Sequence, residues 1–369
     1  MNFDLTKQQI EFREKVRDFA EREVKPVAAY NDENEIFDVE LTKKMADLGL
    51  LGICVPKEYG GQELDTLSYI IAVEELARID GSTAATIAAD NSLGISPIKE
   101  YGTKEQKEKY LPRLCKTHLW GFGLTEENAG CDSRGTQSTA RQEGDSWILN
   151  GSKIFITNSA TPMTLGSTLQ VISGEKNGKP EFTTFLMEND AEGFTQEPMN
   201  RKMMWRASNT GRLTFENVRL PKENMLGAAG EGSHIMLSTL DGGRLSIAAM
   251  GLGCAQGAYE MALAYSQKRE QFGKPVCKFQ AVSFTCIDEV ASFCSCFYFV
   301  WFVNNSEFVN VDAFCFANFC DNIFIAAQDT FYQTVVDSSA NSADCVVIIS
   351  VSCCQTFLWT ATQYFKHLF

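Results

Sequence analysis

The sequence lacks the features that would place a protein in a membrane or direct it out of the cell. Its longest apolar stretch, Phe293 to Val303, is about half of the roughly 20 residues that a membrane-spanning helix needs. The first residues show no basic segment followed by an apolar run, so we expect no secretory signal. We therefore expect a cytoplasmic location, or the mitochondrial matrix if the chain is the processed form of a eukaryotic protein.

Positive charge and metal-ligand patterns are scarce as well. The 33 Lys and Arg residues are outnumbered by 47 Asp and Glu, and the formal net charge of −14 disfavours nucleic acid and anionic membrane surfaces. The three histidines, His118, His234 and His367, are far apart and match no metal-ligand spacing. The 13 cysteines include no CxxC pair. We expect no bound metal, and small molecules or proteins as partners.

The last 87 residues, 283–369, lack Lys and Arg almost completely. They contain only Lys366, whereas the 282 residues before them contain 32 Lys and Arg. They also hold 14 of the 26 phenylalanines and 8 of the 13 cysteines. Neither a helical period nor an alternating strand pattern persists there, so this segment receives no predicted elements.

The remaining sequence predicts an α+β fold that begins with a helical domain, residues 1–118. Thr6 with Gln9, and Thr103 with Gln106, have the spacing of a capping box, in which two side chains satisfy free amides at a helix start. Apolar residues then recur at helical period. A turn-rich stretch at 55–61 separates the predicted helices.

A small β-barrel or sheet domain is predicted for residues 119–229. Asn150-Gly151 lies between two strand-like runs and is the dipeptide best suited to a tight hairpin turn. Further strands are predicted at 182–187 and 212–216. Helical character returns after Gly232, so 230–369 is predicted as a C-terminal helical bundle, with 283–369 divergent.

The most specific motif spans Gly121 to Asp132 and reads GFGLTEENAGCD. A strand that runs into a glycine-bearing loop lets backbone amides and a threonine hydroxyl approach a flat polar ligand closely. Without further context, a structural turn in which Asp132 caps local amides is the favoured interpretation of this motif.

Three further segments supply that context, and they follow in order: KIFITN at 153–158, LDGGR at 240–244, and REQFG at 269–273 with FQ at 279–280. With VPKEYGG at 55–61 and YIIAVEEL at 69–76, they make the chain resemble the acyl-CoA dehydrogenase family, most closely its short-chain, butyryl-CoA type. The resemblance covers residues 1 to about 282. It implies bound FAD and an activity that converts short-chain acyl-CoA to trans-2-enoyl-CoA.

The resemblance also implies site residues and partners. The implied FAD contacts are Phe122, Leu124, Thr125, Phe155, Ile156, Thr157, Arg269, Phe272 and Gln280. The implied substrate contacts are Cys131, Asp241, Gly242, Gly243 and Arg244. Arg269, Phe272 and Gln280 match positions that grip FAD across a subunit boundary, so a homotetramer is expected. Electrons would pass to an electron-transfer flavoprotein.

Some positions depart from the family. Cys131 stands where many relatives have serine, and Glu127 where they have proline. Short-chain relatives place the catalytic glutamate in a Tyr-Glu-Gly-Thr segment near the C-terminus, and the sequence contains no such segment. Other relatives carry this base at the position of Gly243. The catalytic base is therefore unassigned, because proton abstraction needs a carboxylate within hydrogen-bond reach of the α-carbon.

Three explanations stay open for this departure. The gene can be read in a wrong frame after about codon 282, which would leave a chain that folds poorly. The protein can be a non-catalytic homologue that binds FAD and acyl-CoA. It can also be an enzyme that uses another base. An acyl-CoA oxidase is the alternative within the same chemistry, but such enzymes are usually longer.

Overall fold

The computed structural model describes residues 4–283 and 286. These residues divide into two compact units. The larger unit is Phe12–Gly253, and the described residues on either side of it form the smaller one. Helices α1 (Lys7–Phe19) and α8 (Gly232–Lys268) belong partly to each unit. Each unit is described by itself.

Helices fill the chain before residue 115. After α1 come a π-helical turn η1 (Ala20–Val24), α2 (Lys25–Glu33), α3 (Val39–Asp47), a short η2 (Lys57–Tyr59), α4 (Thr66–Ala77), α5 (Gly81–Ala89), a π-helical turn η3 (Asp90–Ile95), α6 (Ser96–Tyr101) and α7 (Lys104–Leu114).

Both predicted capping boxes are confirmed. The Thr103 amide donates to Gln106 Oε1 at 3.0 Å, and the Gln106 amide donates to Thr103 Oγ1 at 3.2 Å. Thr6 and Gln9 exchange the same two bonds at 2.9 and 3.3 Å. Each box satisfies two amides that have no partner inside the helix, so these side chains fix where the helices begin.

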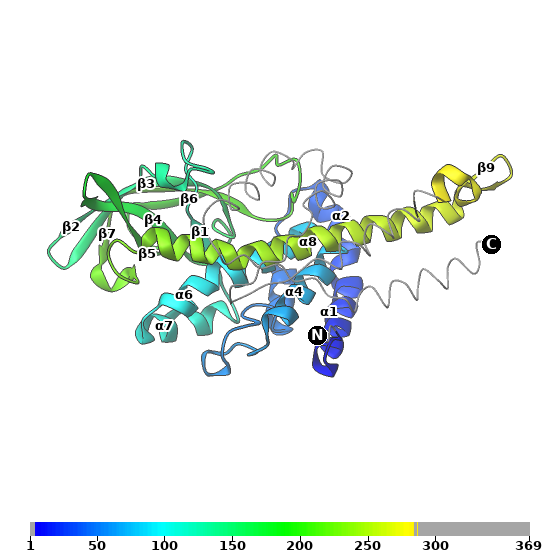
Figure 1. Ribbon diagram of the computed structural model, residues 1–369, viewed down its shortest axis with the longest axis horizontal. Helices are drawn as coiled ribbons and strands as arrows, with labels where there is room; N and C mark the ends of the chain where they lie inside the picture. Colours follow the sequence, from blue (N-terminus) through cyan, green and yellow to red (C-terminus); the bar gives the residue numbers. More distant parts are fainter. Residues whose placement is uncertain (1–3, 284–285, 287–369) are drawn as a thin grey trace. The chain divides into compact units, whose positions relative to one another are not determined.

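The segment that follows is a sheet of eight strands. They are β1 (Leu119–Gly123), β2 (Thr139–Glu143), β3 (Ser146–Thr157), β4 (Thr164–Lys176), β5 (Lys179–Glu188), β6 (Phe194–Pro198), β7 (Thr210–Pro221) and β8 (Met225–Leu226), with short η4 (Ser133–Gly135) and η5 (Lys222–Asn224) between them. The order is β6-β7-β3-β2-β4-β5-β8, and β1 pairs with β4 in parallel. Figure 1 shows these strands gathered together, with α6 and α7 beside them.

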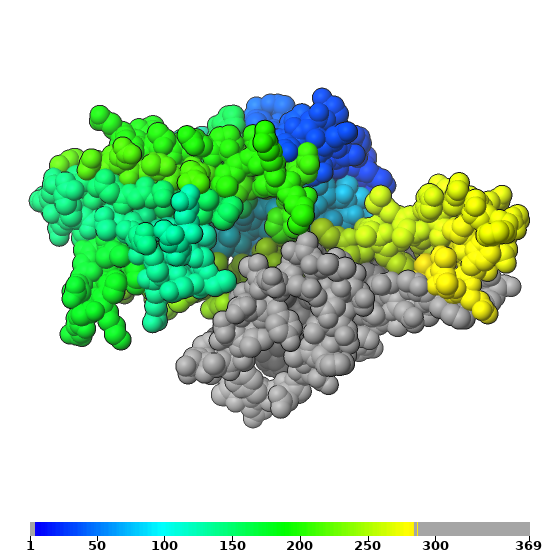
Figure 2. Space-filling view, turned by 90° about the horizontal axis from the view of Figure 1, so that it is seen from above, coloured from blue at the N-terminus to red at the C-terminus, as the bar shows by residue number. Residues whose placement is uncertain are grey.

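One apolar cluster joins the helices and the sheet of the larger unit. Trp120 of β1 stacks on Tyr110 of α7 with ring centroids 5.0 Å apart. Leu186 of β5 and Ile235 of α8 are fully buried in the same cluster. On the surface, Arg206 donates to the carbonyls of Asp32 and Glu33 at 3.0 and 3.1 Å. Figure 2 shows the blue surface of the N-terminal helices adjoining the green surface of the sheet segment.

The prediction of a hairpin turn at Asn150-Gly151 is wrong. Strand β3 continues through both residues, and the chain turns at Gly144 and Asp145, between Glu143 of β2 and its partner Ser146. Gly144 has a φ of +62° there. Gly151 instead marks an irregularity in the pairing of β3 with β7. A Cβ on Gly151 would lie 2.2 Å from Ser138 Oγ, so close strand contact explains this glycine.

After α8 comes a short hairpin of β9 (Glu270–Gln271) and β10 (Lys274–Pro275), followed by η6 (Val276–Lys278). The predicted α+β class is confirmed by helices, then a sheet, then a long helix. The domain boundaries stay a prediction. Among the described residues, no helix combines the length and apolarity needed to cross a bilayer. The tail 287–369, including the segment where a C-terminal base was sought, lies outside the described residues.

Candidate flavin and thioester site

Strand β1 leads into the loop that carries the GFGLTEENAGCD motif. All five residues of β1 are buried. A Cβ on Gly121 would lie 2.4 Å from Ser167 Oγ, and a Cβ on Gly123 would lie 2.4 Å from Leu169 Cδ2. Glycine at these two positions therefore allows β1 to lie tightly against β4. This contact fixes the point at which the loop leaves the sheet.

A buried ion pair supports the loop from the interior of the protein. Lys153 Nζ of β3 lies 2.6 Å from Glu126 Oε1 and donates to the Leu124 carbonyl at 3.2 Å. The lysine side chain is 0% exposed. Burial lowers the pKa of Lys153 to about 8, and the carboxylate of Glu126 opposes that shift. The pKa of Glu126 is lowered because Lys153 and the amides around it outweigh its own desolvation.

Strand β3 presents Phe155 outward beside this loop. Phe155 has a φ of +61°, within a shift of the β3–β7 register, and its side chain is 62% exposed. The next residue, Ile156, points into the sheet core, and Thr157 is half-buried. An exposed aromatic ring can stack on a flat cofactor, whereas the Ile156 side chain is occupied by the core. The flavin roles of all three residues stay a prediction.

The start of α8 meets the loop in a separate apolar cluster. Phe122 and Leu124 pack with Met236 of α8, and Leu93 of η3 and Leu240 of α8 border the same cluster. The four motifs are far apart in sequence, yet two of them come into contact here. This placement positions the LDGGR segment next to the loop that is predicted to hold flavin.

Within LDGGR, the two glycines have different surroundings. A Cβ on Gly243 would lie 3.2 Å from Leu93 Cδ2 and 3.7 Å from Ser92 Oγ, whereas a Cβ on Gly242 would have no neighbour within 4 Å. Asp241 and Arg244 form an ion pair on the exposed part of the helix. Gly243 therefore faces η3, and the charged pair lies at the surface.

Cys131 and Glu127 lie on the exposed side of the loop. Cys131 has a free thiol and is exposed. Asp132 accepts a hydrogen bond from the Arg134 amide at 3.2 Å, as the turn interpretation predicts. Glu127 lies 2.5 Å from Arg212 of β7. This ion pair ties the loop to the sheet at the position where a proline was expected.

In the smaller unit, the residues predicted to reach FAD across a subunit boundary are all exposed. Phe272 is 93% exposed and has a φ of +49° at the turn between β9 and β10. Its ring meets Phe279 edge-on, with centroids 6.0 Å apart. Arg269 follows directly after α8, and Gln280 follows η6. Exposure leaves these three side chains available to a ligand or a second subunit.

Sequence reasoning missed two functional candidates. Lys153 belongs to a recognised motif, but charged residues in strands are usually at the surface, so its burial gave no signal. Asp90 in η3 is fully buried. Desolvation raises the pKa of Asp90 well above its usual value. A π-helical turn often marks a functional segment, but it leaves no pattern in the sequence.

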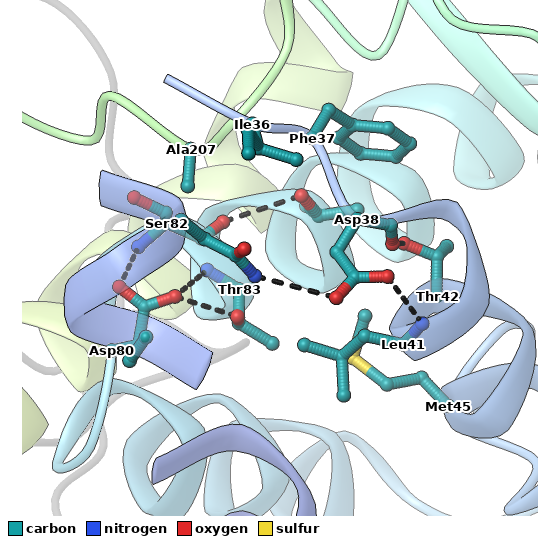
Figure 3. A pocket seen from close by; sticks show the side chains of 13 residues that line it. Ile36, Phe37, Asp38, Leu41, Thr42, Met45, Asp80, Ser82, Thr83 and Ala207 are labelled. Carbon is teal, nitrogen blue, oxygen red and sulfur yellow. Dashed lines mark hydrogen bonds between the residues drawn. The ribbon is translucent and has the colours of Figure 1, made fainter. Parts of the chain in front are cut away.

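A small cavity lies apart from this site, among the N-terminal helices. It encloses about 20 Å³, which is room for about one water molecule. Figure 3 shows Asp38 and Asp80 on its walls, each accepting a backbone amide at a helix start: Leu41 at 2.9 Å and Thr83 at 2.8 Å. The cavity is too small for a cofactor. Among the described residues, no cluster of His, Cys, Asp and Glu could hold a metal ion.

Comparison with known families identifies the same motifs as parts of one family. Three family models match: acyl-CoA dehydrogenase, N-terminal domain, at residues 6–118; the middle domain at 121–218; and the C-terminal domain at 230–303. The last match extends past residue 282, where the resemblance of the sequence was expected to end.

Known relatives agree with these matches. The short-chain specific acyl-CoA dehydrogenase of Clostridium acetobutylicum is 46% identical over 78% of this chain and 76% of its own length. A chain from a structure described as "Electron transferring flavoprotein of Acidaminococcus fermentans: Towards a mechanism of flavin-based electron bifurcation" is 42% identical, covers 81% of this chain and 78% of its own, and has a TM-score of 0.77. A glutaryl-CoA dehydrogenase from Mycobacterium smegmatis, solved in complex with FADH2, is 32% identical over 78% of this chain and 73% of its own, with a TM-score of 0.74.

Proposed function

We propose a function from the premise that this chain belongs to the acyl-CoA dehydrogenase family, an oxidoreductase family that acts on acyl-CoA. The chain binds FAD and a short-chain acyl-CoA, and its described residues are arranged for α,β-dehydrogenation. The observation that carries this proposal is the cluster in which Phe122 of β1 and Leu124 of the loop meet Met236 of α8. It joins the predicted flavin loop to the predicted substrate helix in one place.

The residues present fit a flavin. Phe155 offers an exposed ring, Thr125 and Thr157 are partly exposed residues with hydroxyls, and the Leu124 side chain is buried beside Met236. Arg269, in the smaller unit, is a cation suited to the pyrophosphate of FAD, supplied from a second subunit of a homotetramer. FAD, when bound, supplies the acceptor for the hydride that leaves the β-carbon.

The substrate role falls to the LDGGR segment and Cys131. Helix α8, which borders the loop, carries Asp241, Gly242, Gly243 and Arg244. Cys131 is exposed near the end of the loop. A thiol is a weaker hydrogen-bond donor than the serine hydroxyl of many relatives, so we expect weaker contact with the thioester arm. Electrons pass to an electron-transfer flavoprotein. This partner is supported by a structure whose description names such a flavoprotein and that contains a chain similar to this one.

A second function, binding without turnover, is favoured by one specific observation. The sequence places glycine at 243, its last glutamate is Glu307, and its last acid of any kind is Asp344. Glycine cannot remove a proton, and no Tyr-Glu-Gly-Thr segment supplies another base. Dehydrogenation should therefore be slow or absent, although both ligands still bind.

The test is to purify the full chain, measure its FAD by absorbance, and mix it anaerobically with butyryl-CoA. Bound FAD whose visible band bleaches would establish dehydrogenase activity in this chain. Bound FAD that stays oxidised, with acyl-CoA binding seen by calorimetry, would establish the non-catalytic function. A colourless protein that takes up no added FAD would refute both, and broad unfolding without an oligomer would indicate a poorly folded chain.

A further inference from the structure

The flavin loop is supported by two consecutive residues of β3. Lys153 Nζ donates to the Leu124 carbonyl at 3.2 Å, and the Ile154 amide donates to the Thr125 carbonyl at 2.9 Å. Two successive carbonyls of the loop are therefore held by two successive residues of one strand. The first of these bonds depends on a side chain, and so on the identity of residue 153.

The orientation of one peptide group follows from the first bond. No described peptide bond is cis, and in a planar trans peptide the N–H points opposite to the C=O. Because Lys153 holds the Leu124 carbonyl, the Thr125 N–H is directed away from Lys153. That is the side on which Leu124 and Thr125 are proposed to contact the flavin.

Glu126 extends the support to a second stretch of chain. Its Oε2 accepts the Gln137 amide at 2.7 Å, and its Oε1 accepts both the Ser138 amide at 3.2 Å and Lys153 Nζ at 2.6 Å. One carboxylate thus links both ends of the loop to the lysine beneath it. Hydrogen bonds to charged groups such as these are stronger than bonds between neutral groups.

A buried ion pair stabilises a protein core only after a large desolvation penalty. Removing two charges from water costs several kcal/mol per ion, and apolar residues of similar volume often hold a fold as well or better. A buried lysine and glutamate at 0% and 7% side-chain exposure therefore call for a role that apolar residues could not fill. Directing a backbone N–H is such a role.

We propose that Lys153 and Glu126 are positioning residues that hold the Leu124–Thr125 peptide so that its N–H faces the flavin ring. This inference rests on the proposed flavin site, but it makes a separate statement about the loop. It assigns the pair to cofactor affinity and loop order rather than to the overall stability of the fold.

The experiment compares Lys153→Met, Glu126→Gln and the double variant in the full chain. Each single variant leaves one buried partner unsatisfied, so its melting temperature should fall. The double variant removes both charges, so its melting temperature should return toward that of the unmodified chain. Its FAD dissociation constant, measured by flavin fluorescence, should stay about ten- to a hundredfold weaker, as expected for a lost charge-assisted hydrogen bond.

A second readout needs no cofactor. Hydrogen exchange followed by mass spectrometry on the FAD-free chain should show peptides over 122–127 exchanging at least about tenfold faster in the double variant, since an opening made about 1.4 kcal/mol easier gives this factor. If FAD affinity and loop protection recover together with the melting temperature, the pair is merely structural and the inference is wrong. If the unmodified chain binds no FAD, the proposed function fails, while the exchange data still decide whether the pair orders the loop.

The matched control is another ion pair of the larger unit, between Arg17 and the buried Glu75 at 2.7 Å. The double variant Arg17→Met with Glu75→Gln should change the melting temperature without changing the FAD dissociation constant or exchange at 122–127. A similar loss of FAD affinity in this control would show that the effect is not specific to Lys153 and Glu126, which would overturn the inference.

Discussion

Asp90 shows how a single buried carboxyl couples stability to pH. Its side chain is fully buried in η3, and desolvation raises its pKa well above the ordinary value, while the Trp120 backbone offsets only part of this shift. The folded protein therefore binds a proton that the unfolded chain releases above about pH 4. Stability conferred by this group is present below that pH and is lost as pH rises toward the pKa of the folded state.

We predict that Asp90→Asn removes this loss of folding stability at rising pH. The amide has the same shape and no ionisable proton, so the variant should gain stability relative to the unmodified chain as pH rises above about 4. The limiting slope is about 1.4 kcal/mol per pH unit. Urea unfolding at pH 5, 6, 7 and 8 measures it. Asp145→Asn, at an 89% exposed side chain, is the control for the loss of one carboxylate at the surface; a flat difference for Asp90→Asn would contradict the prediction.

Gly243 offers a second prediction at this scale. A Cβ there would lie 3.2 Å from the flexible end of Leu93 and 3.7 Å from Ser92 Oγ, so the helix should accept a side chain at this position. If the missing base limits turnover, Gly243→Glu should bleach bound flavin on anaerobic mixing with butyryl-CoA, at least about a hundredfold faster than the unmodified chain, as expected when general-base catalysis is restored.

Gly242→Glu is the matched control for this change. It adds the same side chain one residue earlier, where nothing lies within 4 Å, so the helix should tolerate it equally well. The adjacent residue projects about 100° around the helix, so its carboxylate should not reach the same point. Equal rates for the two variants would show that a nearby charge, and not a placed base, changes the reaction.

At the scale of elements, strand β3 depends on Gly151 for its pairing. This glycine has a φ of +149°, and a Cβ there would lie 2.2 Å from Ser138 Oγ and 2.8 Å from Ser138 Cα. We predict that Gly151→Ala destabilises the fold by about 2 to 4 kcal/mol, because the strain and the clash add. Chemical denaturation measures the change.

Gly178→Ala provides the comparison for Gly151. Gly178 also has a positive φ, +73°, but nothing lies within 4 Å of its Cβ position. Only backbone strain applies there, about 1 kcal/mol. If the two substitutions cost the same, contact with Ser138 does not explain why β3 needs a glycine.

These elements also show what local sequence patterns can and cannot predict. Side-chain rules found both capping boxes because the bonds at Thr6 and Thr103 span only three residues. The same rules misplaced the hairpin, because Asn150-Gly151 satisfies a turn and a strand irregularity equally well. The choice between them depends on Ser138, a residue of a neighbouring segment. Long-range packing of that kind cannot be read from a dipeptide.

At the scale of the whole molecule, the α+β class and the family were predictable because four motifs follow in a fixed order. The contact between Leu124 and Met236 was not predictable, since more than a hundred residues separate them in the sequence. The burial of Lys153 was equally hidden, because nothing in the alternation of β3 distinguishes a buried lysine from an exposed one. The order of the motifs identifies the family, whereas long-range packing determines the geometry of the site.

A global prediction concerns FAD itself. A ligand that binds only the folded state adds about 2.7 kcal/mol of stability at a free concentration of 100 times its dissociation constant. Added FAD should therefore raise the melting temperature of the full chain in a concentration-dependent way, as measured by scanning fluorimetry. FMN, which lacks the AMP half and therefore the pyrophosphate, should have less effect; equal shifts would argue against the proposed role of Arg269 toward the FAD pyrophosphate.

The left-handed backbone at Phe155 has a consequence for engineering this fold. A bulky residue in that conformation is disfavoured by about 1 kcal/mol or more. Substitution by glycine would relieve the strain and also remove an exposed ring from the surface. A selection for heat resistance alone would therefore favour glycine at this site, and, if Phe155 contacts the flavin as proposed, the selected variants would be more stable but bind FAD more weakly.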